Sequence, residues 1–363
     1  MIKSPEDIDM NASNENHQTF RPKTFADVTG QDEIKEYLKL NISVFKKNRT
    51  AIGHILFLGF SGVGKTTLAN VMANEMGVGF HQVMANRIKT WDDFYALLKK
   101  VEENDVLFID EIHALNSKIQ EHLYGVMEDF TCTIADKNLQ QPFLRRLPKF
   151  TLIGATTHAG ELNAPLLSRF QYKCNLVPYT IEQLTQMVIS AGRRIYGIEV
   201  PIEIANRIAK LSRRTARNCY NILRAFMIVV EANYPGKVNS NMLTEDLLYK
   251  TLKYLQIDPI VGLDNVSRKY LVTLLRDSSP IGSKSLATMT HEQESTILHT
   301  IEPFLMSDIE LEYLAKDGQK KLVGPFAKIT KKGRWYTENA VKYIKLCNTL
   351  KQNGWFANES LEI

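Results

Sequence analysis

Residues 59–67 read GFSGVGKTT, and this segment gives the strongest indication of the architecture of the chain. They fill the pattern G-x-x-x-x-G-K-[ST], in which glycines let successive backbone N–H groups point at a phosphate chain while the following helix adds its positive end. The Lys65 ammonium can reach the β- and γ-phosphates, and the Thr66 hydroxyl can ligate Mg²⁺. The residues predicted to hold a nucleotide here are Gly59, Gly62, Gly64, Lys65, Thr66 and Thr67.

The sequence around this loop predicts a parallel α/β sheet. Residues 54–60 (HILFLGF) form an apolar run typical of a buried strand, and residues 66–76 have the pattern of a helix. Residues 80–83 and 91–101 add a second strand and helix further along. Alternation of strands and helices is the arrangement that a parallel sheet requires.

Two acidic residues follow the next apolar strand, in DVLFIDEIH at residues 105–113. In a P-loop enzyme the first acid, Asp110, holds the Mg²⁺ shell. The second, Glu111, polarises the attacking water as a general base. Adjacent acids after a strand are common by chance, but their place well downstream of Lys65 favours the catalytic interpretation.

Residues 150–157, FTLIGATT, predict a further buried strand that ends in Thr156 and Thr157. Both threonines emerge at the carboxyl edge of the sheet, where ligands of such folds bind. One of them can hold the attacking water or contact the γ-phosphate. Two threonines that merely finish a strand are the alternative.

Three arginine positions downstream are candidates for contact with a nucleotide. Arg169, in PLLSRF, can reach the γ-phosphate of a neighbouring subunit; in isolation, a surface salt bridge would explain it better. Arg217 ends RRTAR and precedes an amphipathic run at residues 218–231, where it can touch the nucleotide from a helical bundle. We expect Arg213 and Arg214 to be solvated.

Composition sets limits on the class of protein. The 363 residues, 44% of them hydrophobic, predict more than one domain. The net charge of +5 permits nucleic-acid binding without requiring it. Four scattered cysteines argue against a disulfide framework or a cysteine zinc site and favour a reducing cytoplasm. We find no zincin histidine spacing, membrane-spanning run or signal peptide, and residues 1–19 are expected to be a disordered tail.

These motifs in this order resemble the AAA+ ATPases, and more specifically the RuvB family of Holliday-junction branch-migration motors. The resemblance rests on RPKTFADVTGQ (residues 21–31), DVLFIDEIH, LYGVMEDF (123–130), LPKFTLIGATTHAG (147–160) and VGLD (261–264). It implies that Asp110 and Glu111 are the Walker B pair, that Thr157 is sensor 1 and that Arg169 is the arginine finger. It also implies that Arg217 is sensor 2 and that residues 25–31 lie near the adenine.

The chain departs from the family pattern at several places. It has PLLSRFQ where the family has PLRDRFG, and RTAR where the family has GTPR. Residues 131–146 are also altered, in the β-hairpin that docks on the partner RuvA in the family. These departures leave the partner open and are compatible with a divergent, phage-borne member.

The C-terminal third resembles a winged helix. SPIGSKSLA (residues 279–287) and TILHTIEPFL (296–305) predict a helix-turn-helix, with Pro303 ending its second helix. ITKKGRWYT (329–337) resembles the wing, with Gly333 at its tip. Residues 308–326 resemble an insertion, and residues 338–350 predict a final helix. The side chains expected to contact DNA phosphates are Lys328, Lys331, Lys332 and Arg334; a basic, solvated hairpin is the alternative.

Together these observations predict an α/β P-loop AAA+ domain with a parallel sheet (residues 20–178), a helical lid (179–257) and a winged-helix domain (258–363). The resemblance implies an ATP- and Mg²⁺-dependent motor in the bacterial cytoplasm, or that of a phage host. It implies a ring, by family analogy a hexamer, that drives branch migration of four-way junctions with or without a RuvA-like partner. Two alternatives stay open: a clamp-loader or helicase-loader ATPase, and a DNA-binding scaffold that keeps ATP as a structural ligand.

Overall fold

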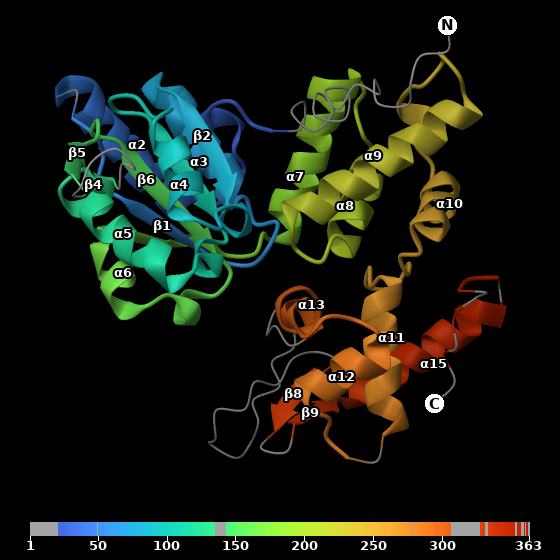
Figure 1. Ribbon diagram of the computed structural model, residues 1–363. Helices are drawn as coiled ribbons and strands as arrows, with labels where there is room; N and C mark the ends of the chain where they lie inside the picture. The colour runs from blue at the N-terminus through green and yellow to red at the C-terminus, as the bar shows by residue number, and fades with distance from the viewer. Residues whose placement is uncertain are drawn as a thin grey trace, which may run out of the picture. The chain divides into compact units, whose positions relative to one another are not determined.

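The computed structural model describes residues 21–48, 50–134, 143–277, 279–305, 327–330 and 333–352, and residues 354–356, 359 and 361 near the C-terminus. The chain divides into two compact units, Met1–Pro178 and Tyr179–Ile363. Each unit is described by itself (Figure 1). Among the described residues, no helix combines the length and the apolar character that crossing a membrane requires.

The first unit is built on a five-stranded parallel sheet, as the sequence predicted. Its strand order is β2-β3-β6-β1-β7. Because the strands are parallel, each connection crosses over a face of the sheet, and helices lie in those connections. The strands are β1 (Ile55–Leu58), β2 (Phe80–Met84), β3 (Val106–Asp110), β6 (Thr151–Thr156) and β7 (Tyr172–Asn175).

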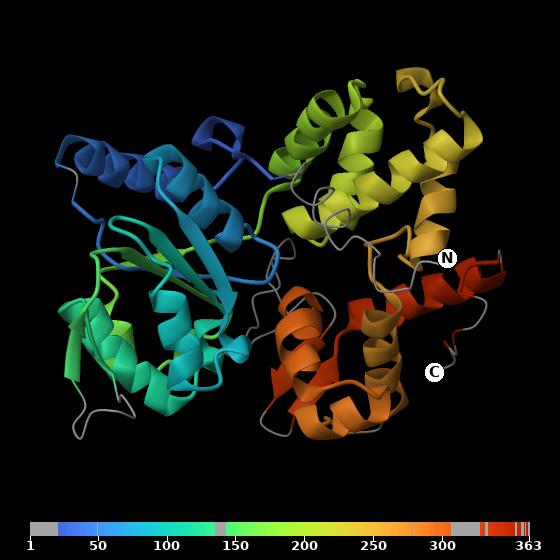
Figure 2. The same cartoon turned by 45° about the horizontal axis from the view of Figure 1, so that its top comes forward.

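Helices cover both faces of this sheet (Figure 2). On β3, Val106 and Phe108 enter the core shared with α2 (Asp32–Asn48) and α3 (Lys65–Met76). The alternate residues Leu107 and Ile109 enter the opposite core, shared with the three helices α4 (Trp91–Leu98), α5 (Ser117–Glu128) and α6 (Ala164–Arg169). Burial on both faces explains why the strands are continuous apolar runs.

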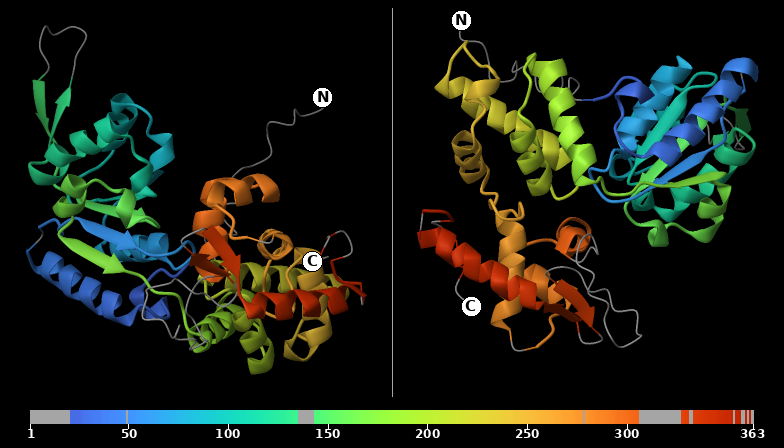
Figure 3. Two further views of the ribbon diagram at one scale, coloured as in Figure 1. Left: turned by 90° about the horizontal axis from the view of Figure 1, so that it is seen from below. Right: turned by 180° about the vertical axis from the view of Figure 1, so that it is seen from behind.

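An antiparallel hairpin stands out from the rest of this unit, as the left view of Figure 3 shows. It consists of β4 (Thr131–Ile134) and β5 (Phe143–Arg146). Phe143 and Leu144 on β5 are exposed. The altered segment 131–146 is therefore a hairpin, and its residues 135–142 lie outside the described part of the chain.

The second unit is mostly helical. It begins with α7 (Ile181–Ala191), α8 (Ile202–Leu211), α9 (Ala216–Asn233) and α10 (Glu245–Leu255). It continues with α11 (Asn265–Arg276), α12 (Ser283–Thr290), α13 (Glu294–Thr296), α14 (Glu302–Leu305), the hairpin of β8 (Ala327–Thr330) and β9 (Gly333–Tyr336), and α15 (Glu338–Gln352). Short 3₁₀ or π turns span Phe25–Asp27, Ala85–Arg87, Ile112–Ala114, Ala159–Glu161, Gly192–Tyr196, Ser240–Met242 and Ile297–Ile301.

The helices and hairpin after Asn265 share one core, which has the winged-helix arrangement that the sequence predicted. A separate lid and winged-helix domain stays a prediction, because residues 179–363 form one compact unit. Residues 308–326, interpreted as an insertion, lie outside the described residues.

Two local expectations in this region were wrong. The second helix does not end at Pro303, because a π turn at Ile297–Ile301 precedes it and α14 continues to Leu305. A widened turn changes the hydrogen-bond pattern, so a proline without an N–H is tolerated there. Gly333 is not the tip of the wing: it pairs with Thr330 as the first residue of β9.

Candidate functional site

The ends of three neighbouring strands place the sequence motifs at one edge of the sheet. Leu58, the last residue of β1, pairs with Thr156 of β6. Ile109 of β3 pairs with Gly154 of β6. Residues that directly follow these strands therefore lie side by side, although they are far apart in the sequence.

The phosphate loop follows β1 and requires glycine. Gly59, Gly62 and Gly64 have positive φ angles of 141°, 83° and 103°. A Cβ atom on Gly59 would lie 2.5 Å from the carbonyl oxygen of Leu176, so no other residue fits. Gly64 precedes α3 as its N-cap and offers no capping side chain, so the helix N-terminus can face an external anion.

Lys65 lies inside this loop. Its side chain is only 6% exposed, and its Nζ donates hydrogen bonds to the carbonyl oxygens of Gly59 (2.7 Å) and Phe60 (3.0 Å). Thr66 and Thr67 follow in the first turn of α3 and are half-buried. The loop thus joins an ammonium, a helix N-terminus and two hydroxyls, a donor set that fits a phosphate chain and its Mg²⁺.

The two acids at the end of β3 adopt different backbone conformations. Asp110 is the last residue of the strand, and its Oδ1 accepts a hydrogen bond from the backbone N of Glu111 (3.1 Å). Glu111 has φ 50° and ψ 50°, a left-handed conformation that is uncommon outside glycine, asparagine and aspartate. Such a conformation at an acidic residue beside a phosphate loop is typical of a functional position.

The two threonines after β6 have separate roles. Thr157 donates from its backbone N and from Oγ1 to the same atom, Oε2 of Glu111, both over 3.1 Å. Thr156 is fully buried, and its Oγ1 contacts Nδ1 of His113 at 2.8 Å. Thr157 therefore bonds to Glu111, whereas the buried Thr156 contacts His113 instead.

Arg169 is the last residue of α6 and lies against α5. Its Nη2 pairs with Oε1 of Glu128 at 3.1 Å, and its guanidinium carbon lies 4.2 Å from the ring centroid of Tyr124. Its Nη1 donates to the carbonyl oxygen of Pro165 (2.7 Å). In this chain alone, the arginine is thus held by its own unit.

Arg217 belongs to the second unit, where it is exposed in the first turn of α9. The two arginines before it are bonded rather than solvated, contrary to expectation. Arg213 pairs with Asp264 at 3.0 Å, and Arg214 donates to the carbonyl oxygen of Tyr179 (2.9 Å). Burial acts to raise the pKa of Asp264, but Arg213 and the bonds from Ser267 outweigh it and lower that pKa.

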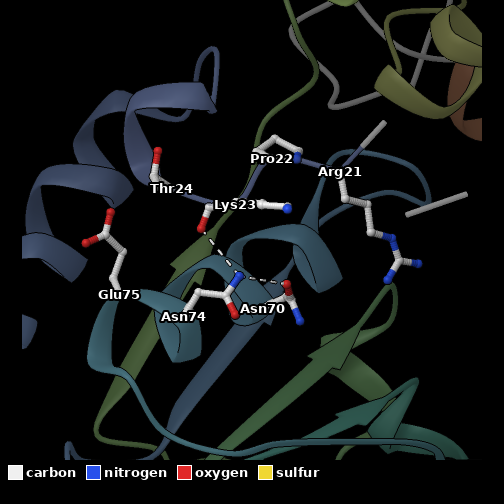
Figure 4. Close-up of a pocket in the computed structure, with 7 residues that line it drawn as sticks. All are labelled: Arg21, Pro22, Lys23, Thr24, Asn70, Asn74 and Glu75. Atoms are coloured by element: carbon white, nitrogen blue, oxygen red, sulfur yellow. Dashed lines mark hydrogen bonds between the residues drawn. The ribbon is translucent and has the colours of Figure 1, made fainter. Parts of the chain in front are cut away.

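A pocket of about 550 Å³ lies between the segment before α2 and helix α3 (Figure 4). Nδ2 of Asn74 donates to the carbonyl oxygen of Lys23 (3.3 Å) across this pocket. Since α3 begins at Lys65, the pocket lies along the helix that leads away from the phosphate loop. Its lining residues are Arg21, Pro22, Lys23, Thr24, Asn70, Asn74 and Glu75.

Comparison with known proteins agrees with this geometry. A family described as "Holliday junction DNA helicase RuvB P-loop domain" matches residues 20–176, and "RuvB C-terminal winged helix domain" matches residues 260–318. The "Holliday junction branch migration complex subunit RuvB" of Campylobacter hominis is 39% identical over 301 residues, 82% of this chain and 86% of the relative. The protein of that name from Myxococcus xanthus is 35% identical over 345 residues, 94% and 92% of the two chains.

The chain belongs to the RuvB family. Its fold is also similar to the solved Thermotoga maritima RuvB Holliday junction branch migration motor, with a TM-score of 0.76 and 31% identity over 90% of this chain and 99% of that one. A lysine-to-arginine variant of the same Thermotoga protein matches equally well, with a TM-score of 0.76 and 31% identity. These relatives confirm the family resemblance and do not favour the clamp-loader alternative.

The wing expected in a RuvB family member is only partly described. Lys331 and Lys332, expected to contact DNA, lie outside the described residues, and so does the side chain of Lys328. Arg334 is described, and its Nε pairs with Oε1 of Glu302 at 2.8 Å. Contact of Arg334 with DNA stays a prediction, and it requires the guanidinium to leave or share this ion pair.

Sequence reasoning assigned no role to two histidines at this site. His113 and His158 follow Glu111 and Thr157, and their rings lie 4.9 Å apart in an edge-to-face arrangement. The available signal was that both histidines lie within three residues of the ends of strands that prove to be neighbours. That signal becomes meaningful only once β3 and β6 are known to pair.

Proposed function

We propose that this chain is a subunit of a ring-shaped, ATP-driven motor that drives branch migration of four-way DNA junctions. The observation that carries the proposal is the shared sheet edge, where the phosphate loop, the Asp110–Glu111 pair and Thr157 meet. The names of the 35–39% identical relatives support the same activity. Their work on DNA also supports a cytoplasmic location.

The residues of the loop have distinct parts in binding. Backbone N–H groups at Gly59, Gly62 and Gly64 and the Lys65 ammonium neutralise the phosphate chain. Thr66 and Asp110 hold the Mg²⁺ shell, and Thr67 lies beside them in the first turn of α3. When bound, Mg²⁺–ATP supplies the phosphoanhydride bond whose cleavage drives the motor.

Glu111 acts as the general base and removes a proton from the attacking water. The two hydrogen bonds from Thr157 orient its carboxylate, so that Thr157 couples the end of β6 to the reaction. Arg217 contacts the nucleotide from the helices of the second unit. Movement of these helices between nucleotide states transmits the reaction to the DNA.

Arg169 completes the active site of the neighbouring subunit in a ring, by family analogy a hexamer. To do so its guanidinium leaves Glu128 and Tyr124, which hold it in the isolated chain. Such a transfer makes hydrolysis depend on assembly, because the arginine then acts on the nucleotide of the neighbouring subunit.

The winged helix holds DNA through backbone phosphates, with Lys328, Lys331, Lys332 and Arg334 as the contact residues. Contacts of this type are independent of sequence and weaken steeply with salt. The exposed Phe143 and Leu144 of the β4–β5 hairpin suit contact with a RuvA-like junction-binding partner.

The test is ATP-dependent dissociation of a synthetic four-way junction by the purified chain, with Glu111→Gln as the control. We expect dissociation by the parent and none by the variant, alone or after addition of a RuvA-like protein. ATP hydrolysis without dissociation under both conditions would contradict the motor and favour a remodelling ATPase.

A further inference from the structure

Glu111, His113 and His158 form a compact cluster of potential metal ligands. One ligand atom from each residue lies within 4.8 Å of the other two. His113 Nδ1 is 3.3 Å from Oε2 of Glu111. All three side chains are half-buried, so each keeps some access to solvent.

The hydrogen bonds around His113 allow it to act as a ligand. Thr156 Oγ1 accepts a bond from the backbone N of His158 (2.9 Å), which leaves the hydroxyl proton free to point at Nδ1 of His113 (2.8 Å). In this arrangement the Nδ1 lone pair accepts the Thr156 hydroxyl proton and Nε2 carries the ring proton, so the hydroxyl has to turn away before Nδ1 can bind a metal. An imidazole lone pair and a carboxylate oxygen at such short range repel one another unless a proton or a cation lies between them.

The opposite side of His113 faces a second carboxylate. Its Nε2 lies 3.8 Å from Oε2 of Glu161. Metal-binding histidines commonly donate their other N–H to a carboxylate, which sets the tautomer and makes the ligand more basic. At 3.8 Å Glu161 is beyond hydrogen-bond range, so its exposed side chain has to move slightly closer to become the outer partner of a bound metal.

We propose that Glu111, His113 and His158 bind a zinc-class transition-metal ion that blocks hydrolysis by occupying the catalytic carboxylate. Two imidazoles and one carboxylate suit Zn²⁺ and leave its fourth position to water. Mg²⁺ prefers oxygen ligands in octahedral geometry and is disfavoured here. The site differs from the cysteine-based zinc sites that the sequence argues against.

The three ligand atoms move closer together when a zinc ion binds. Ligands about 2.0–2.1 Å from a tetrahedral zinc ion lie about 3.3 Å from one another. The Glu111–His113 distance already meets this value, whereas the other ligand atoms are separated by at most 4.8 Å. Rotation of His158, which is bonded to Thr157 Oγ1 at 2.8 Å, supplies the difference.

Metal binding is tested without nucleotide, by titrating Zn²⁺ against a fluorescent zinc chelator in the presence of the metal-free full chain. We expect one zinc ion per chain and at least tenfold weaker binding in each of three separate variants, His113→Asn, His158→Asn and Glu111→Gln. His291→Asn is the matched control, because His291 is exposed, lies outside the cluster and has a left-handed φ of 57° that asparagine tolerates. Equal affinity in the parent and in all three correctly folded variants would overturn the site.

The proposed inhibition of ATP hydrolysis by zinc rests on the proposed function and on the role of Glu111 in it, whereas zinc binding at the cluster does not. With Mg²⁺ in excess, zinc should inhibit ATP hydrolysis over the range in which it binds, and a chelator should restore the rate. His158→Asn should need at least tenfold more zinc for the same fractional inhibition. Zinc bound at the cluster without inhibition would overturn the block. A parent that hydrolyses no ATP without zinc would instead contradict the proposed function, and the binding titration would still decide the site.

Discussion

Two donors of Thr157 converge on one oxygen of Glu111: the backbone N–H and the hydroxyl are each 3.1 Å from Oε2. The bond joins the residue after β6 to the residue after β3, two strands that pair directly. The acid is thereby held in its left-handed conformation beside the phosphate loop. This contact is the basis of the first two predictions.

Glu111→Gln should retain nucleotide binding and lose turnover. Glutamine has the same shape and accepts the same bonds from Thr157, but its amide cannot take a proton from water. We expect ATP hydrolysis to fall by roughly 10²–10⁴-fold, the usual contribution of a general base. Steady-state ATPase assays and binding of a fluorescent nucleotide would measure the two properties; hydrolysis at the parent rate would contradict the assignment.

Thr157→Val should slow hydrolysis less than Glu111→Gln does. Valine keeps the backbone bond to Glu111 and removes the hydroxyl, which contacts both Oε2 of Glu111 and Nδ1 of His158. The lost bond to Glu111 is worth about 1 kcal/mol, so a loss of about fivefold in kcat is expected. Thr157→Ser is the matched control, since it keeps the hydroxyl and should stay close to the parent rate. A serine variant as slow as the valine variant would show that the hydroxyl does not orient Glu111.

Arg169→Ala should reduce hydrolysis in neighbouring subunits. Because the finger acts on the next active site, inactive chains mixed with parent chains should lower activity more than their share of the ring. Arg193→Ala is the control, because Arg193 forms an exposed ion pair with Glu199 in the second unit. Activity strictly proportional to the parent fraction would argue against a shared site.

Unfolding of the first unit should depend on pH through His54. Its Nε2 donates to the carbonyl oxygen of Met127 (3.0 Å), and its Nδ1 accepts from the backbone N of Leu152 (2.9 Å). Burial lowers the pKa of His54 to about 4, despite the opposing bond to Met127. The neutral form is therefore the one that the folded state stabilises.

The unfolded chain binds a proton near pH 6.5, while the folded one does not until about pH 4, so stability is full above pH 6.5 and declines as the pH falls. Between pH 7 and pH 5 we expect a loss of about 2 kcal/mol in the free energy of unfolding. Denaturant unfolding at both values would measure it. His54→Gln should remove this part of the pH dependence, and an unchanged slope in that variant would exclude His54 as its source.

The second unit should depend on a buried ion pair. Arg268 is fully buried; its Nε pairs with Oε2 of Glu359 at 2.8 Å, and its guanidinium carbon lies 4.0 Å from the ring centroid of Phe356. Glu359→Ala leaves this charge buried without its partner and should destabilise the unit by about 3–5 kcal/mol. Glu199→Ala, which removes an exposed partner, should have a much smaller effect in the same unfolding measurement. Equal effects would contradict the assigned burial.

The local sequence alone determined the phosphate loop, the parallel sheet and the family. Local patterns such as the glycines Gly59 and Gly64 and the apolar runs of the strands act over only a few residues. Their structural consequence can therefore be predicted from the sequence pattern. The same reasoning selected four site residues at or just after the ends of strands and a helix: Asp110, Glu111, Thr157 and Arg169.

Which of these residues meet depends on how the elements pack. Strand order brings Thr157 to Glu111 and places His113 beside His158, since pairing of β3 with β6 joins segments separated by a helix and a hairpin. The sequence likewise does not distinguish Arg268, which is buried against Glu359, from an arginine on the surface. Residue type and local pattern specify the elements, but contacts between distant elements depend on how the whole chain packs, and the chemistry of this site depends on those contacts.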